Sequence, residues 1–234
     1  MFPIGDDNSD RQITPVVNYA IIGLNVLVFV LLQQLGTNEQ FTYAFSLVPR
    51  EITTGIDLIH PAVVHDGFGH TGEIPEYAAP LGVYFNILSS MFMHGGIAHI
   101  AGNMLFLFIF GDNIENAVGH LRYAIFYLLC GIAAAAGQII IGPDSVIPML
   151  GASGAISGVL GGYILLFPTR SVRAIIFNIL TTVPAFVAIG IWIVYQLVLG
   201  YLTPSAGGGV AYSAHIGGFL AGLILVKPFT FGRN

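Results

Sequence analysis

The chain has 234 residues, of which 55% are hydrophobic and only 8% charged, and its mean hydropathy is +0.82. Soluble domains carry about 25% charged residues, so this chain has too little charge to cover a water-facing surface. Its net charge of −5 includes no basic patch, which argues against nucleic acid as a partner. These properties predict a polytopic membrane protein of the all-α class.

Six apolar segments are long enough to cross a bilayer. We expect membrane-spanning helices over Val16–Leu35, Ile97–Val118, Leu121–Ile141, Met149–Phe167, Ala174–Leu199 and Val210–Val226. Pro184 is expected to bend the fifth of them. The sequence thus predicts one domain over residues 1–234, a six-transmembrane-helix bundle with a short polar tail over residues 1–14.

The connection over residues 36–96 is unusually long and polar. It holds six of the twelve acidic residues and four of the seven histidines. Its apolar pieces, Phe41–Val48 and Leu81–Phe92, are too short to cross a bilayer and suit a loop that lies at the membrane interface. We therefore expect a long interfacial first loop.

The cations predict the orientation, because cytoplasmic loops are enriched in Lys and Arg. With the N-terminus inside, six of the seven cations are cytoplasmic: Arg11, Arg122, Arg170, Arg173, Lys227 and Arg233. Only Arg50, in the long loop, then lies outside. Both termini are predicted to be cytoplasmic, and the acids before the first span argue against a cleaved leader. Short loops favour a prokaryotic plasma membrane.

Polar residues recur where the second, fourth and sixth spans begin at the outer face. His99 and Asn103 are four residues apart and share one helix face. Ser153 is expected roughly 5–8 Å below the start of its helix, at ~1.5 Å per residue. His215 opens the sixth span. Polar groups inside a membrane segment are costly, so their common depth predicts one shared, water-filled cavity.

A serine hydroxyl is a weak nucleophile unless a base lies beside it, and His215 is the candidate base for Ser153. His99 and Asn103 are candidates for the oxyanion hole, together with the Ser153 backbone N–H. Small residues also let helices approach closely, so packing is the competing interpretation of the glycines. The candidate packing glycines are Gly151, Gly154, Gly158, Gly218 and Gly222. We expect a Ser–His dyad without a carboxylate, with Asp144 a turn residue.

Three motifs together resemble the rhomboid family of intramembrane serine proteases: GASG at 151–154, HIAGN at 99–103 and AHIGGFLAG at 214–222. The resemblance covers nearly the whole chain. It implies that Ser153 is the nucleophile and His215 the general base, and that His99 and Asn103 line the oxyanion hole. It also implies cleavage of transmembrane protein substrates near their outer ends. Some members carry a tyrosine under the histidine where this chain has Ser157.

Other interpretations remain open. His60, His65 and His70 are spaced five apart and could bind a metal, but that spacing matches neither helix nor strand, so a solvated loop is favoured. We expect no cofactor and no metal. Cys130 is expected to be a small buried side chain. A catalytically dead relative that binds membrane proteins, and a small transporter, are the competing functions; the polar groups lie near one face rather than the midplane, which disfavours transport.

Overall fold

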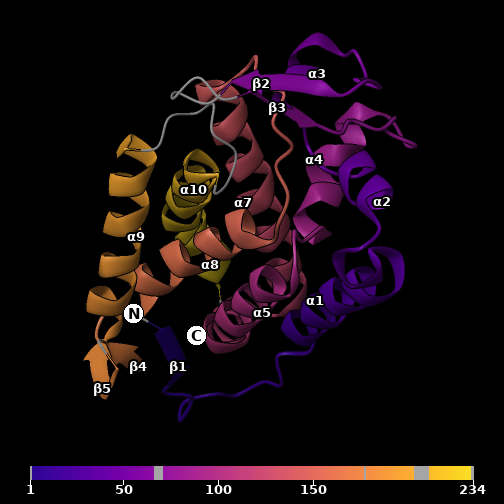
Figure 1. Cartoon of the computed structure of the whole chain (residues 1–234). Helices are drawn as coiled ribbons and strands as arrows, with labels where there is room; N and C mark the ends of the chain where they lie inside the picture. The colour runs from indigo at the N-terminus through magenta and orange to yellow at the C-terminus, as the bar shows by residue number, and fades with distance from the viewer. Residues whose placement is uncertain (1, 66–70, 177, 203–210, 233–234) are drawn as a thin grey trace.

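The computed structural model describes residues 2–65, 71–176, 178–202 and 211–232, and it is mostly helical (Figure 1). Four helical segments are long and apolar enough to cross a membrane: Ile97–Val118, His120–Ile141, Ala185–Leu202 and Tyr212–Thr230. Three shorter apolar helices accompany them: Val16–Leu32, Val83–Phe92 and Ser153–Leu166. Among the described residues, the first and fourth predicted spans are therefore represented by these shorter apolar helices.

The predicted spans correspond to one or more helices each. α1 (Val16–Leu27) continues through a π-helical turn to Leu32, and α5 (Ile97–Phe106) continues through a similar turn into α6 (Asp112–Val118). Four more helices follow: α7 (His120–Ile141), α8 (Ser153–Leu166), α9 (Ala185–Leu202) and α10 (Tyr212–Thr230).

The start of α8 differs from the expectation. The residues before it form hydrogen bonds with the first loop instead of with the helix: Leu47 and Met149 exchange two backbone bonds, and the Gly151 N–H donates to the Ser90 carbonyl at 2.8 Å. Ser153 is therefore the first residue of α8, so the predicted depth of several ångströms below its helix start is wrong. The connection between α7 and α8 descends to the interior of the molecule, where α8 begins (Figure 1).

The first loop is folded rather than irregular. It contains α2 (Glu39–Ala44), α3 (Pro49–Thr54), the antiparallel pair β2 (Ala62–His65) and β3 (Thr71–Ile74), and α4 (Asn86–Ser89) between two 3₁₀ turns. In Figure 1, α3, β2 and β3 lie at the upper end of the molecule, and α2 and α4 lie below them on the right. His70, one of the three candidate metal ligands, lies outside the described residues.

A three-stranded antiparallel sheet corrects the expectations for the N-terminal tail, the fifth span and the fold class. Its order is β1 (Phe2–Asp6), β4 (Ser171–Ile176) and β5 (Ile179–Pro184). The tail contributes a strand, and the start of the predicted fifth span is a hairpin whose β-branched residues suit strands and whose first strand pairs with β1. Asn178 lies in the hairpin turn with φ of 64°. Pro184 ends β5 and precedes α9, so it bends no helix; the chain is mostly helical rather than all-α.

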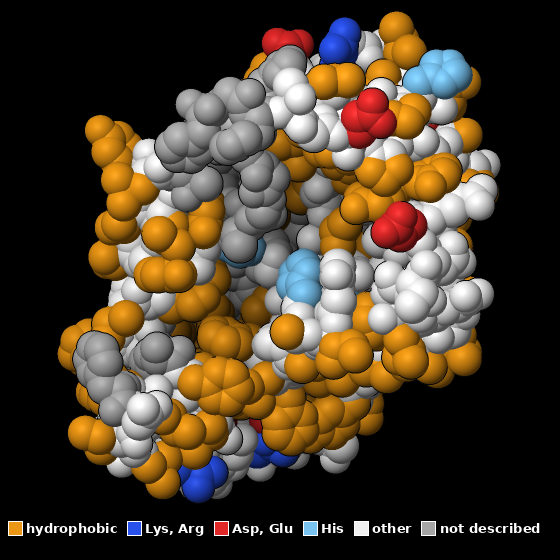
Figure 2. All heavy atoms as spheres, in the orientation of Figure 1, with side chains coloured by type: hydrophobic (Ala, Val, Ile, Leu, Met, Phe, Trp, Pro, Cys, Tyr) orange, Lys and Arg blue, Asp and Glu red, His pale blue; other side chains and the backbone are white. Residues whose placement is uncertain are grey.

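Side-chain contacts tie the N-terminal segment to the sheet end of the bundle. Arg11 pairs with Asp112 of α6, and Arg170 pairs with Asp10. The Tyr163 hydroxyl of α8 donates to the Asp6 carboxylate at 2.6 Å. On the face shown in Figure 2, most charged side chains lie towards the two ends of the molecule, and hydrophobic side chains cover much of the surface between them. This distribution suits a protein embedded in a bilayer.

Candidate active site

Glycines bring α8 and α10 close together. A Cβ atom on Gly218 would overlap the carbonyl oxygen of Gly154, and one on Gly222 would overlap the carbonyl oxygen of Gly158. A Cβ on Gly154 would itself lie 2.6 Å from the Cβ of Ala134 on α7. Backbone therefore packs against backbone along this interface, as small residues permit in membrane helices.

This close approach joins the two side chains that the sequence singled out. The Ser153 hydroxyl, at the first residue of α8, lies 2.8 Å from Nε2 of His215, one turn into α10. His215 is buried and Ser153 is half-buried. A hydroxyl at this distance from an unprotonated imidazole nitrogen can donate its proton to it, which is the geometry that general-base activation requires.

His99 and Asn103 lie on one face of α5 and line the same cavity as Ser153. The Gly95 N–H donates to Nδ1 of His99 at 3.3 Å, which leaves the proton of a neutral ring on Nε2. The Nδ2 of Asn103 is buried and has no acceptor among the described residues. The cavity thus contains two side-chain donors without a fixed acceptor, in addition to the free N–H groups of the first turn of α8.

Gly151 shapes the floor beside these donors. Its φ is +126°, and a Cβ there would lie 2.9 Å from two atoms of the His99 ring. A residue with a side chain would be strained by its backbone angle and would displace the ring. Gly151 thus holds the turn into α8 against His99, whereas the other four candidate glycines lie in the helices themselves.

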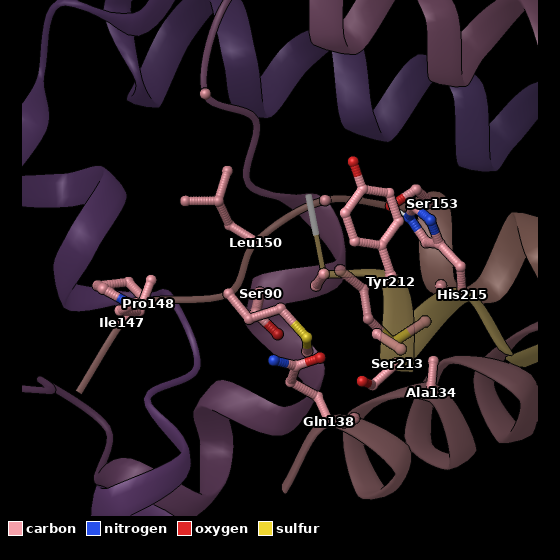
Figure 3. Close-up of a pocket in the computed structure, with 18 of the residues that line it drawn as sticks. Ser90, Ala134, Gln138, Ile147, Pro148, Leu150, Ser153, Tyr212, Ser213 and His215 are labelled. Atoms are coloured by element: carbon pink, nitrogen blue, oxygen red, sulfur yellow. Dashed lines mark hydrogen bonds between the residues drawn. The ribbon is translucent and has the colours of Figure 1, made fainter. Parts of the chain in front are cut away.

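The cavity around these residues has a volume of about 880 Å³. Its walls come from α5, α7, α8, α9 and α10 and from the loop that leads to α8. Figure 2 shows the hollowed face of the molecule, and Figure 3 shows Ser153 and His215 adjacent to each other, with Leu150 and Pro148 along that loop. A cavity of this size can hold several residues of an extended peptide.

Two neighbours of His215 were not recognised as site residues from the sequence. Oε1 of Gln196, on α9, lies 2.8 Å from Nδ1 of the ring, and the Trp192 ring lies 5.9 Å from it between centroids. Gln196 lies in the interior of the predicted fifth span, where an amide can simply bond a neighbouring helix. The sequence does mark this residue, since Gln196 is the one amide in the apolar run of α9. It does not show which helix the side chain faces.

Ser157 does not take the place of a stacking tyrosine. Its hydroxyl donates to the Ser153 carbonyl oxygen at 2.6 Å, four residues earlier on the same helix. Cys130 is buried against Gly158, as a small apolar side chain would be. No cluster of three metal-binding side chains occurs within the ranges that the structure describes.

Membrane-length helices around a buried polar cavity define a multi-pass membrane protein. A family model described as the rhomboid domain matches residues 82–230, more than half of the chain. The protein therefore belongs to the rhomboid family, as its motifs indicated. The match begins at the 3₁₀ turn before α4 and ends at the last residue of α10, so it contains every residue of the candidate site.

Three curated relatives differ in what their names say of activity. Rhomboid protease GluP of Bacillus subtilis is 28% identical over 228 residues, 94% of this chain and 37% of that protein. Rhomboid protein 1, mitochondrial, of Saccharomyces cerevisiae is 27% identical over 219 residues, 88% of this chain and 51% of that protein. Inactive rhomboid protein 1 of Drosophila melanogaster is 34% identical over 82 residues, 35% of this chain and 6% of that protein. The chain thus spans about half or less of each relative.

Proposed function

We propose that this protein is an intramembrane serine endopeptidase that hydrolyses transmembrane proteins near their extracytoplasmic ends. The observation that carries the proposal is the 2.8 Å contact between the Ser153 hydroxyl and Nε2 of His215, inside a cavity where the buried Nδ2 of Asn103 has no partner among the described residues. No cofactor is needed for this chemistry. A relative named as a protease, similar over 94% of this chain, supports it.

In the proposed reaction, Nε2 of His215 takes the hydroxyl proton while Oγ of Ser153 attacks a peptide carbonyl. The carbonyl oxygen becomes an oxyanion, which accepts hydrogen bonds from Nδ2 of Asn103 and the Ser153 backbone N–H, with Nε2 of His99 as a third donor. The protonated ring then donates to the leaving amine, which completes an acyl-enzyme. Water attacks the ester while Nε2 of His215 takes its proton; the ring then returns a proton to Oγ of Ser153 as the ester bond breaks and the new carboxyl end of the substrate leaves.

The bilayer makes two demands on this reaction. Water must reach Ser153, and the substrate helix must expose a carbonyl that its own hydrogen bonds conceal. The cavity supplies room for water, and substrates with Gly or Pro near the outer end unwind most easily. We propose that substrates enter from lipid beside α9, because Trp192 and Gln196 line the cavity while half of the residues of that helix are exposed.

The positions of the cations support an orientation of the protein in the membrane. Arg11 and Arg170 lie at the sheet end of the bundle, and Arg50 lies on α3 at the opposite end (Figure 1). With the cation-rich end in the cytoplasm, the first loop is outside and the cavity opens outward. We place the protein in a prokaryotic plasma membrane with both ends of this chain inside.

A peptide assay in liposomes tests the activity. Two single-span peptides differ only in the outer turn, one with Gly and Pro and one with Ala and Leu. We expect the purified protein to cleave the first faster, at a bond near the outer end, and Ser153→Ala to cleave neither. Equal products from the two proteins, or none from either, would contradict the proposal. The name of the inactive relative suggests the alternative, a non-catalytic binder, which would retain peptides uncleaved.

A further inference from the structure

Gln196 is the one amide side chain of α9, and it is directed inward. It is 6% exposed, and Trp192, one turn earlier on the same face, also lines the cavity. A buried amide is costly unless it is hydrogen-bonded. Gln196 has such a partner, because Oε1 lies 2.8 Å from Nδ1 of His215.

That contact selects one form of the imidazole. A neutral ring carries its proton on one nitrogen only. Since the amide oxygen of Gln196 is an acceptor, Nδ1 of His215 must be the donor, and Nε2 is left with its lone pair towards the Ser153 hydroxyl. In the other tautomer, two acceptors would face each other at Nδ1, and the N–H at Nε2 could not take the serine proton.

We propose that Gln196 is a positioning residue of the active site: it fixes the tautomer and the ring plane of His215, which has no carboxylate partner among the described residues. The proposal rests on the proposed function. Gln196 touches the base and not the reacting atoms. The titratable group that faces the ring from another helix is His99 of α5, and Trp192 of α9 lies along its side. Ser157 is bonded to the backbone instead.

The placement of Gln196 also connects the base to the helix beside which substrates are proposed to enter. Ser153 and His215 lie on α8 and α10, whose backbones are in contact, whereas Gln196 lies on α9. A displacement of α9 would leave the pair together but withdraw the acceptor from Nδ1. His215 would then be a competent base only while α9 is packed against α10.

The test measures the rate at which a fluorophosphonate labels Ser153, as a function of pH, in the full chain. Gln196→Leu removes the acceptor, and we expect the plateau rate to fall about three- to tenfold, the effect of one neutral hydrogen bond. Gln196→Glu keeps an acceptor and adds a negative charge, which favours the protonated ring. We expect it to keep the plateau but to raise the midpoint of the pH profile by about 1 unit. Tyr195→Leu, an exposed neighbour on α9, is the matched control.

A merely structural role predicts a different result: less folded protein, with an unchanged rate per active molecule and an unchanged midpoint. Wild-type midpoints and plateaus in both Gln196 variants would overturn the proposal while leaving the serine protease intact. Failure of the proposed function is distinct, because the wild-type protein would then not be labelled. If Gln196→Glu does not fold, ¹⁵N spectra of histidine-labelled wild-type protein decide: the proton of neutral His215 must be on Nδ1, and a proton on Nε2 contradicts the inference.

Discussion

The carbonyl oxygen of Gly158 on α8 lies against the α-carbon of Gly222 on α10, with no room for a side chain between them. One turn closer to the cavity, Gly154 and Gly218 repeat the arrangement. Ser153 directly precedes Gly154 on α8, and His215 lies three residues before Gly218 on α10. The distance between the serine and the histidine is therefore set by the absence of side chains between their helices.

Adding one methyl group at this interface should separate the pair. In Gly222→Ala, the new Cβ would overlap backbone atoms of Gly158, which cannot rotate away. We expect a loss of about 1–3 kcal/mol in stability, typical of overpacking, and at least about tenfold slower labelling of Ser153. Gly190→Ala is the matched control, because a Cβ at Gly190 of α9 would meet nothing within 4 Å. Equal labelling of both variants would refute the role of the glycine contact.

Substitution of Asn103 should lower the rate of catalysis without lowering the stability of the protein. Its Nδ2 is buried and unpaired in the described structure, so Asn103→Ala removes a donor that contributes no hydrogen bond to the fold. We expect kcat for peptide cleavage to fall about 10²- to 10³-fold, as for loss of an oxyanion donor, with little change in KM. The thermal midpoint should not fall with kcat. A variant that loses stability and activity together would indicate a structural amide instead.

Two buried carboxyl groups make the first loop sensitive to pH. Burial, with the nearby charges of Glu51 and Asp57, raises the pKa of Glu76 to about 8, and burial raises the pKa of Glu51 to about 7. In an unfolded chain these carboxyl groups have the ordinary pKa of glutamate, 4.5. Between pH 4.5 and about 8 the folded protein binds more protons at these two groups than the unfolded chain does. Their contribution to stability is therefore complete below pH 4.5 and is lost as the pH rises to about 8.

Thermal unfolding between pH 5 and pH 9, with hydrogen exchange of α2 and α3, measures this decline. Glu76→Gln mimics the neutral carboxyl group and should flatten the pH dependence. Glu39→Gln changes an exposed carboxylate of the same loop and should leave the slope as in the wild type. Stability that increases with pH over this range would show that the loop carboxylates are stabilised in their charged form.

A reversible disulfide tests entry beside α9. A Cβ built on Gly200 of α9 lies 3.0 Å from the Cβ of Tyr212 on α10, so cysteines at both positions can be joined with little movement. We expect the disulfide of Gly200→Cys/Tyr212→Cys to slow cleavage of single-span peptides at least about tenfold and a reductant to restore it. Labelling by a small phosphonate should change much less. Equal peptide cleavage by the oxidised and reduced protein would exclude entry at this helix.

The sequence predicted the helices that carry His99, Ser153 and His215, because long apolar runs and glycine spacing are local signals. It did not predict the hairpin over residues 171–184. Its apolar run resembles a transmembrane segment, and only pairing with the distant strand Phe2–Asp6 decides for strands. The late start of α8 has a similar cause, since Met149 forms its backbone bonds with Leu47.

The same limit applies within the site. Four polar residues of the candidate site could be chosen because each opens an apolar helix at a similar depth. Gln196 lies in the interior of α9, where composition alone does not distinguish a packing amide from one that faces a base. Its role depends on the rotation of α9 relative to α10, which is a tertiary property.

The most direct measurement of the central claim is active-site labelling of the purified protein with a fluorophosphonate, followed by mass spectrometry of the modified peptide. We expect covalent modification of Ser153, none in Ser153→Ala, and labelling slower by about 10²-fold or more in His215→Ala. A wild-type protein that resists labelling, or a Ser153 that reacts equally fast without His215, would contradict it.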